Sequence, residues 1–167
     1  MIGIKSRHLA LLIMVASLTL QGCGFQLRGS TNLPSSIGPV FIQGVGEYEE
    51  LGRELTQMIT YSDLQVVKTR DSAVSTLKIT QRASDRRVIS VDGNGNVAEY
   101  ELHEGATFSL IAADGHELVK EQVVSITSTY LNSETEVLGK QQEEGTLRKD
   151  MQRDLASQIM RRLEAQL

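Results

Sequence analysis

The stretch 75–131 sets the architecture of this chain, because three long segments of strand-like composition follow one another with turn signals between them. The first turn signal is Asp92-Gly93-Asn94-Gly95-Asn96, and Asn-Gly is the dipeptide that suits a tight hairpin turn. The second turn signal is Asp114-Gly115. Arms of about 15 residues joined by short turns predict an antiparallel sheet that dominates the domain.

Helical patterns lie on both sides of this stretch. Residues 47–62 and 143–167 repeat apolar side chains at helical spacing, and the apolar stripe of the second helix predicts core packing. The segments 40–42 and 64–68 read as short strands. We expect an α+β fold in the order β-α-β-β-β-β-α. It is a two-layer sandwich, with a mixed, mostly antiparallel sheet of four to five strands and two helices on one face. The first two strands are expected to pair in parallel.

The strand register follows from the turn residues. With Asn94-Gly95 as the first turn, Leu77 lies opposite Ala112 and starts an apolar face. In the second hairpin a two-residue turn would expose Val124 and Ile126, so we expect a longer turn or a bulge there.

The first hairpin is longer than a helix packed beside it can cover. Strand residues advance about 3.3 Å and helix residues about 1.5 Å, so a helix of about 16 residues covers about seven strand residues. We therefore expect the distal half of the hairpin, residues 85–100, to extend beyond the helices or to be covered by another protein.

The N-terminus has the layout of a secretory signal peptide. After a short basic start, the apolar run 9–20 is too short to span a bilayer, which needs roughly 20 apolar residues. It ends in Leu20-Gln21-Gly22-Cys23, which resembles the lipobox of bacterial lipoproteins. Cys23 is the single cysteine of the chain, so it has no partner for an internal disulfide. We expect residues 1–22 to be removed as a signal peptide.

Cys23 is the predicted lipidation site, carrying diacylglycerol and a fatty acid such as palmitate, because stable anchoring takes two or more acyl chains. Gly24 follows it, instead of the aspartate that commonly retains lipoproteins at the inner membrane, so we expect the outer membrane. Residues 23–38 read as a lipidated tether, and residues 39–167 as a single α/β sandwich domain.

Charge and composition exclude several classes of function. The chain carries a net charge of −4 and has no tryptophan, which disfavours nucleic-acid binding. Without the two basic residues of the leader, −4 − 2 gives about −6. The sequence lacks a nucleophile elbow, an HExxH pair, a phosphate-binding glycine loop and a Cys/His cluster. We expect no enzyme, no metal and no cofactor other than the covalent lipid.

The start of the mature chain, Cys23-Gly24-Phe25-Gln26-Leu27-Arg28, resembles the opening of LPS-assembly lipoproteins of the LptE family. The resemblance continues at Leu33-Pro34, Ala98-Glu99-Tyr100 and Leu138-Gly139-Lys140, and in the closing helix. It implies a two-layer sandwich that sits as a plug in the lumen of the outer-membrane barrel LptD. It also implies that the pair moves lipopolysaccharide to the cell surface.

The resemblance further implies lipopolysaccharide binding through basic residues. One of these matches Lys140, which we place just before the last helix, in a loop. The other lies near the hairpin turn, where this chain has Gly93 and no cation.

A second basic group could replace the missing cation. Lys78, Arg82 and Arg86 recur every four residues, which in a regular strand places all three on the outward face. Guanidinium groups bind phosphate in a bidentate manner. The alternative is a solvated strand face neutralised by Glu99 and Glu101.

Three classes of function compete on these observations. The first is a subunit for lipopolysaccharide assembly with LptD, lipid-anchored at the outer membrane, with its domain in the barrel lumen or facing the periplasm. The alternative is an outer-membrane lipoprotein adaptor that activates a cell-wall synthase. The third is a lipid-anchored enzyme.

Overall fold

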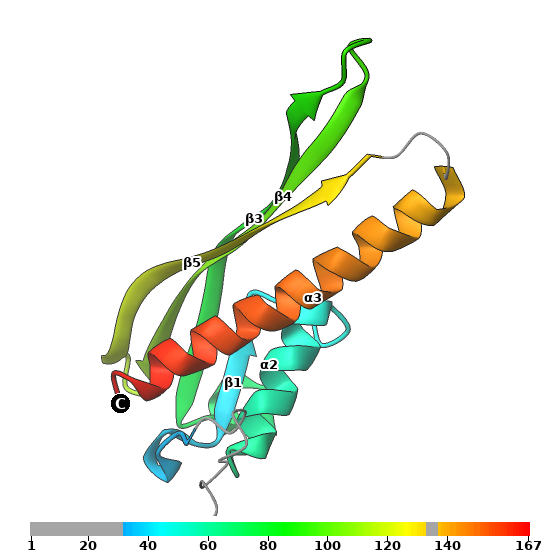
Figure 1. Cartoon of the computed structure of the whole chain (residues 1–167). Coiled ribbons are helices and arrows are strands. Elements are labelled where there is room, and N and C mark those ends of the chain that lie inside the picture. The colour runs from blue at the N-terminus through cyan, green and yellow to red at the C-terminus, as the bar shows by residue number, and fades with distance from the viewer. Residues whose placement is uncertain (1–31, 133–136) are drawn as a thin grey trace, which may run out of the picture.

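The computed structural model describes residues 32–132 and 137–167, without the side chains of 137–141. One layer is a five-stranded sheet, and the other holds two helices that cover a single face of it (Figure 1). The strands are β1 (Val40–Gln43), β2 (Val66–Val67), β3 (Ser75–Val91), β4 (Val97–Ala112) and β5 (Glu117–Leu131). The helices are α2 (Glu50–Tyr61) and α3 (Val137–Glu164). The predicted fold class and element order are confirmed.

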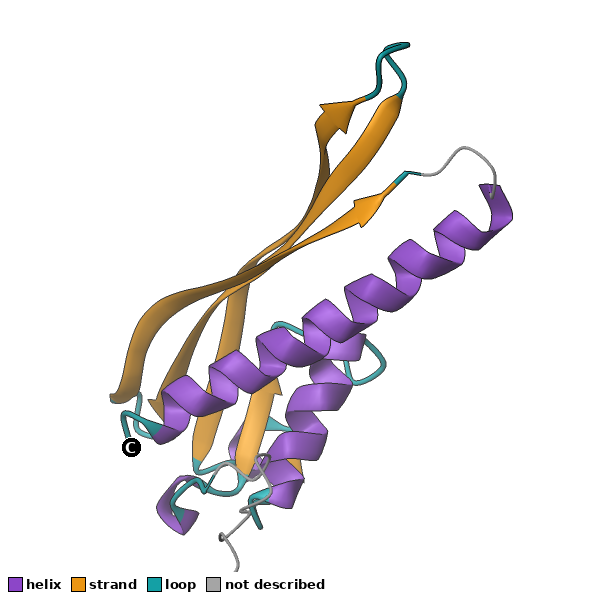
Figure 2. Cartoon of the chain, in the orientation of Figure 1, coloured by secondary structure: helices purple, strands orange, loops and turns teal. Residues whose placement is uncertain are grey.

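The strands, orange in Figure 2, form one sheet with the order β2-β1-β3-β4-β5. The short strand β1 pairs in parallel with both β2 and β3, whereas β3, β4 and β5 form antiparallel pairs. The predicted parallel pairing of the first two strands is confirmed. β5 is therefore one edge of the sheet, and the two-residue strand β2 is the other.

The core lies between the helices and the half of the sheet that is farther from the tip of the β3–β4 hairpin. Its largest fully buried side chains include Phe108, Leu51, Leu55, Ile59, Leu77, Leu110, Leu155 and Ile159. Together with Met151 and Leu163, which are also buried, these residues confirm that the stripe of α3 packs in the core. Full burial of a large aliphatic side chain stabilises the fold by about 1.5–3 kcal/mol.

The first helix begins three residues later than predicted. A turn precedes α2, in which the Gly46 N–H donates to Glu49 Oε1 over 2.8 Å and the Glu49 N–H donates to the Gly46 carbonyl. Glu49 is consequently the residue before the helix, and Tyr48 lies outside the helix with 87% of its surface exposed.

The packed region begins earlier than the predicted domain boundary. Leu33 and Ile37 are buried in the core cluster, and Ser75 Oγ donates to the Ile37 carbonyl over 2.6 Å. Both residues fall inside the predicted tether, 23–38, so its last part belongs to the folded domain.

The predicted register of the first hairpin was wrong by two residues, since Leu77 pairs with Leu110 and not with Ala112. One cause is the turn, which is closed by the Asp92 N–H donating to the Asn96 carbonyl over 2.8 Å. Three residues lie between them, and Gly95 takes a φ of +85°, which glycine adopts without steric cost. The other cause is a set of bulges along the β3–β4 pair.

The bulge nearest the core changes the face of the sheet to which the following side chains of β3 point. Thr80 lies opposite Thr107, but Ala83 lies opposite Gly105, so β3 holds one extra residue where Gln81 takes a φ of +45°. Because successive side chains alternate between faces, this insertion turns the residues from Ala83 to Val88, where the register next shifts, to the opposite face. Arg86 accordingly points to the helix side.

The second hairpin contains the expected irregularity. Phe108 lies opposite Gln122, whereas Leu110 lies opposite Val119, so β5 contains an additional residue between these pairs. This bulge keeps Val124 buried at 1% exposure, as the apolar pattern required.

Candidate functional site

The β3–β4 hairpin projects past the helices (Figure 1). The 17 residues of β3 span about 56 Å, whereas the 28 residues of α3 span about 42 Å. The projecting part exposes Val88, Ile89 and Val91 at 50%, 43% and 59%. The hairpin therefore extends beyond the helices with exposed apolar side chains, but over a shorter part than the predicted residues 85–100, because Arg86 binds Glu144 of α3 and Tyr100 packs on the cluster that contains Met151.

An aromatic and charged cluster joins the base of the projecting hairpin to α3. Arg86 Nη1 donates to Glu144 Oε2 over 2.8 Å and to the Tyr130 hydroxyl oxygen over 3.4 Å. The Arg86 guanidinium also lies 4.5 Å from the centroid of the Tyr100 ring, a cation–π distance. Tyr100 stacks on Tyr130 with centroids 5.5 Å apart, and the Tyr130 hydroxyl donates to Glu144 over 2.7 Å.

Arg148 carries the network toward the core. It donates to Glu104 Oε1 over 2.7 Å, to Ser84 Oγ over 3.0 Å and to Glu144 Oε1 over 3.0 Å. Glu104 is 3% exposed, so the Arg148 guanidinium compensates a buried carboxylate. Gln152 donates to the second oxygen of Glu104 over 3.3 Å. This chain of contacts, which we call the hinge network, links β3, β4 and β5 to α3.

The charges of the hinge network are stabilised by its hydrogen bonds. Burial alone would raise the pKa of the Glu144 carboxyl, but donors from Tyr130, Arg148 and Arg86 outweigh it and hold that pKa below its usual value. The hydrogen bonds to Tyr130 and then to Glu144 raise the pKa of Arg86. Glu144 and Arg86 therefore stay ionised through neutral pH.

The predicted outward row of cations was wrong. Lys78 is exposed on the outward face, but Arg82 forms an ion pair with Glu49 beside the start of α2. Arg86 lies on the helix side, bound to Glu144. The bulge at Gln81 separates the three, because it reverses the alternation on which the row depended.

The two other predicted sites are Lys140 and Cys23. Lys140 belongs to the first turns of α3 and not to a loop before it, and its side chain lies outside the described residues. Cys23 lies outside them entirely. In the described ranges no group of three His, Cys, Asp or Glu residues could hold a metal ion. No helix within those ranges is long and apolar enough to cross a membrane.

Sequence reasoning missed the hinge network. A partial signal existed, because Glu144 and Arg148 are four residues apart and so share one face of a helix. Glu104 is the only buried charged residue among the described residues, and it interrupts an apolar alternation in β4. No pattern in the sequence indicated that Glu104 and Arg148 contact each other across the two layers.

Comparison with known proteins identifies the family. The model of the family described as "LptE: Lipopolysaccharide-assembly" matches residues 37–163. The chain belongs to the LptE family. The matched range runs from the end of a short 3₁₀ helix, Ser35–Ile37, to the last turn of α3. It includes every residue of the hinge network. LptE proteins are non-enzymatic lipopolysaccharide-assembly lipoproteins, which confirms the expectation that the chain is not an enzyme.

The chain is also similar to individual proteins of known sequence or structure. The LPS-assembly lipoprotein LptE of Yersinia pestis (strain Pestoides F) is 28% identical over 162 residues, which cover 95% of this chain and 76% of the relative. The solution structure of lipoprotein B from Nitrosomonas europaea has a TM-score of 0.67 at 28% identity, over 86% of this chain and 92% of that one. The crystal structure of the rare lipoprotein B from Shewanella oneidensis has a TM-score of 0.64 at 24% identity, over 75% and 93% of the two chains, and supports the fold alone.

Proposed function

We propose that this lipopolysaccharide-assembly lipoprotein works at the outer membrane with the barrel LptD, as a subunit inserted in the barrel lumen or facing the periplasm. Diacylglycerol and fatty acid on Cys23 would anchor it. The observation that carries the proposal is the projecting hairpin, whose exposed Val88, Ile89 and Val91 are not covered by the helices of the chain. Apolar side chains at such a position are typical of a surface that another protein covers.

The partner is testable by extraction of the full lipidated chain in mild detergent. We expect a large outer-membrane barrel to co-purify with it. Amides of residues 85–100 should exchange with deuterium at least about tenfold more slowly in the complex than in the separated protein, because docking removes local opening. Residues 114–116, in the turn at the other end of the sheet, serve as the internal control.

Two results would contradict this assignment. Co-purification of an inner-membrane cell-wall synthase, without a barrel, would favour the alternative adaptor function. Equal exchange of residues 85–100 in both samples would mean that the hairpin is not the docking surface.

Direct binding of lipopolysaccharide is the second part of the proposal. Lys140 matches a basic residue implicated in this binding in the family, and Lys78 is an exposed cation on the outward face. Arg82 and Arg86 remain candidates, but each already contacts a carboxylate, so a phosphate would have to compete with Glu49 or Glu144.

Charge reversal separates ligand contacts from general electrostatics. Each charge-assisted contact is worth about 1.5–3 kcal/mol before solvent screening, so Lys140→Asp or Lys78→Asp should weaken lipopolysaccharide binding roughly fivefold or more. The control is Arg161→Asp, an exposed reversal near the end of α3. Binding would be measured at low and moderate salt. Equal losses in all three variants would indicate a net-charge effect and remove both lysines from the site.

A further inference from the structure

A groove lies where the end of β5 and the N-terminal half of α3 separate. Its volume is about 620 Å³, and its lining comes from β4, β5 and one face of α3. Figure 1 shows α3 diverging from the sheet toward this end of the molecule. The groove is distinct from the exposed apolar residues of the hairpin tip, and neither Arg86 nor Arg148 lines it.

The groove follows the free edge of the sheet. Thr129, Tyr130 and Leu131 are consecutive residues of β5 and all line it, although their side chains alternate between the two faces. The Asn132 N–H donates to the Ala98 carbonyl of β4 over 2.7 Å. In an antiparallel pair, every second residue before Asn132, beginning with Tyr130, therefore also directs its backbone groups toward β4. The backbone groups of Thr129 and Leu131 consequently point away from β4, toward the open edge.

A second contact agrees with this backbone orientation. Arg162 Nη1 donates to the Val123 carbonyl over 2.7 Å. Val123 lies an even number of residues before Thr129, so its backbone groups also point away from β4. An open edge of this kind can accept a further extended strand, whose backbone then pairs with it.

The charge of the groove selects the chemistry of its occupant. Three carboxylate residues, Glu99, Glu143 and Asp150, line it, and no basic residue does so among the described residues. The nearby guanidinium groups of Arg86 and Arg148 are held by Glu144 and Glu104. These carboxylates favour a lysine or arginine in the occupant.

Apolar surface accompanies these charges. Leu131 is 69% exposed on the strand side of the groove, and Leu147 is half-buried on the helix side. The aliphatic stem of a lysine or arginine packs on surface of this type while its charged end reaches a carboxylate. Carboxylates, apolar walls and an open strand edge together fit an extended cationic peptide segment.

We propose that this groove is a docking site for an extended protein segment that pairs with the edge of β5 at Thr129 and Leu131. The segment places a lysine or arginine against the carboxylates that α3 contributes to the groove, Glu143 and Asp150. The inference rests on the proposed function in one respect, because the segment belongs to the outer-membrane partner of the assembly complex.

The test is photo-crosslinking from the groove in cells that make the full lipidated chain. A photoreactive phenylalanine replaces Thr146, an exposed residue in the groove wall of α3, and crosslinked peptides are identified by mass spectrometry. We expect one partner segment that contains a lysine or arginine. Glu143→Lys/Asp150→Lys should lower the crosslink yield about fivefold, the effect of losing two partly exposed ion pairs. Replacing the partner's cation by glutamate should restore the yield in that double variant.

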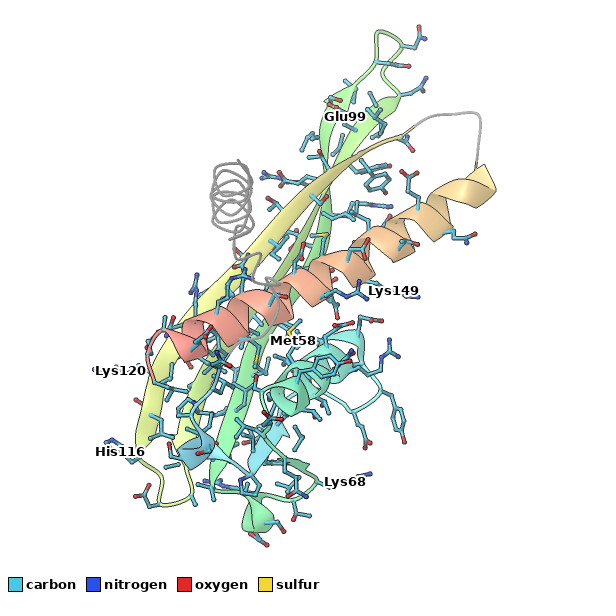
Figure 3. The ribbon with its side chains drawn as sticks, turned by 60° about the horizontal axis from the view of Figure 1, so that its bottom comes forward. Met58, Lys68, Glu99, His116, Lys120 and Lys149 are labelled. Atoms are coloured by element: carbon cyan, nitrogen blue, oxygen red, sulfur yellow. The ribbon has the colours of Figure 1, made fainter. Side chains whose placement is uncertain are left out.

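The control changes the same number of charges elsewhere on the sheet. Asp114→Lys/Glu121→Lys lies at the β4–β5 turn and in β5, at the end of the molecule where Figure 3 labels His116 and Lys120, far from Glu99. It should leave the crosslink unchanged. A yield that the groove variant does not lower, or crosslinks only to lipid, to this chain itself or to a segment without a cation, would overturn the inference. If the barrel still co-purifies in that sample, the proposed function stands without the groove.

Discussion

Replacing Arg148 with methionine is expected to lower the free energy of unfolding by about 2–3 kcal/mol. The change leaves Glu104, which is 3% exposed, without the guanidinium that lies 2.7 Å from it. Removing one partner of a buried ion pair costs about 3–5 kcal/mol, and the contacts of Glu104 with Ser84 and Gln152 reduce that loss here. Thermal unfolding should show a fall in Tm of about 5–10 °C.

A matched control lies one and a half turns along the same helix. Arg153 pairs with Glu54 over 3.3 Å, but its side chain is 59% exposed, so Arg153→Met should cost less than about 1 kcal/mol. The double variant Glu104→Gln/Arg148→Met should recover most of the lost stability, because no uncompensated charge remains. Equal losses for Arg148→Met and Arg153→Met would show that Glu104 does not depend on Arg148.

The same variant tests whether the hinge network orients the hairpin. Arg148 contacts Ser84 of β3 and Glu104 of β4, and both lie at the point where the sheet leaves the helix layer. Amides near Arg86 should therefore exchange faster in Arg148→Met than in Arg153→Met. A partner that binds the projecting hairpin would then have to order it on docking, which lowers affinity.

The three long strands could be predicted because the sequence signals for a strand and for a turn lie within a few neighbouring residues. Turn residues such as Gly95 and alternating apolar residues such as Phe108 and Leu110 report the strand state without reference to the rest of the fold. The length mismatch that exposes the hairpin also followed from the sequence, since it depends only on rise per residue. The two-layer sandwich followed from the order of helices and strands. The family resemblance added the role in lipopolysaccharide assembly, which the family match over residues 37–163 confirmed.

The position of Arg86 could not be predicted, because it depends on one inserted residue. The bulge at Gln81 has no signature in composition, yet it decides whether the side chains from Ala83 to Val88 face solvent or α3. The contact between Glu104 and Arg148 joins residues 44 apart, so only the packing of the two layers brings them together. Candidate sites on strands therefore depend on register to a degree that sites on helices do not.

Replacing Cys23 with alanine is expected to abolish lipid attachment completely. The lipobox reading requires a thiol that becomes a thioether to diacylglycerol, and an alanine methyl group offers no nucleophile in its place. Cys23 is the single cysteine of the chain, so no other residue can substitute for it. The variant should keep residues 1–22, remain uncleaved by the lipoprotein peptidase and run as the larger precursor. It should take up no radioactive palmitate.

The consequence for location depends on how strongly the folded domain holds its partner. One acyl chain binds a membrane only marginally, and two or more bind it stably, so the anchor is strong before assembly. Once a barrel encloses the domain, the protein interface supplies most of the retention, and loss of lipid should then matter less. A soluble form that begins at Gly24, directed to the periplasm by an unrelated signal, should therefore reach the outer membrane only when the barrel partner is present. Normal maturation and palmitate labelling of Cys23→Ala would disprove the lipobox, whereas outer-membrane binding of the soluble form without the barrel would locate the anchor in the domain itself.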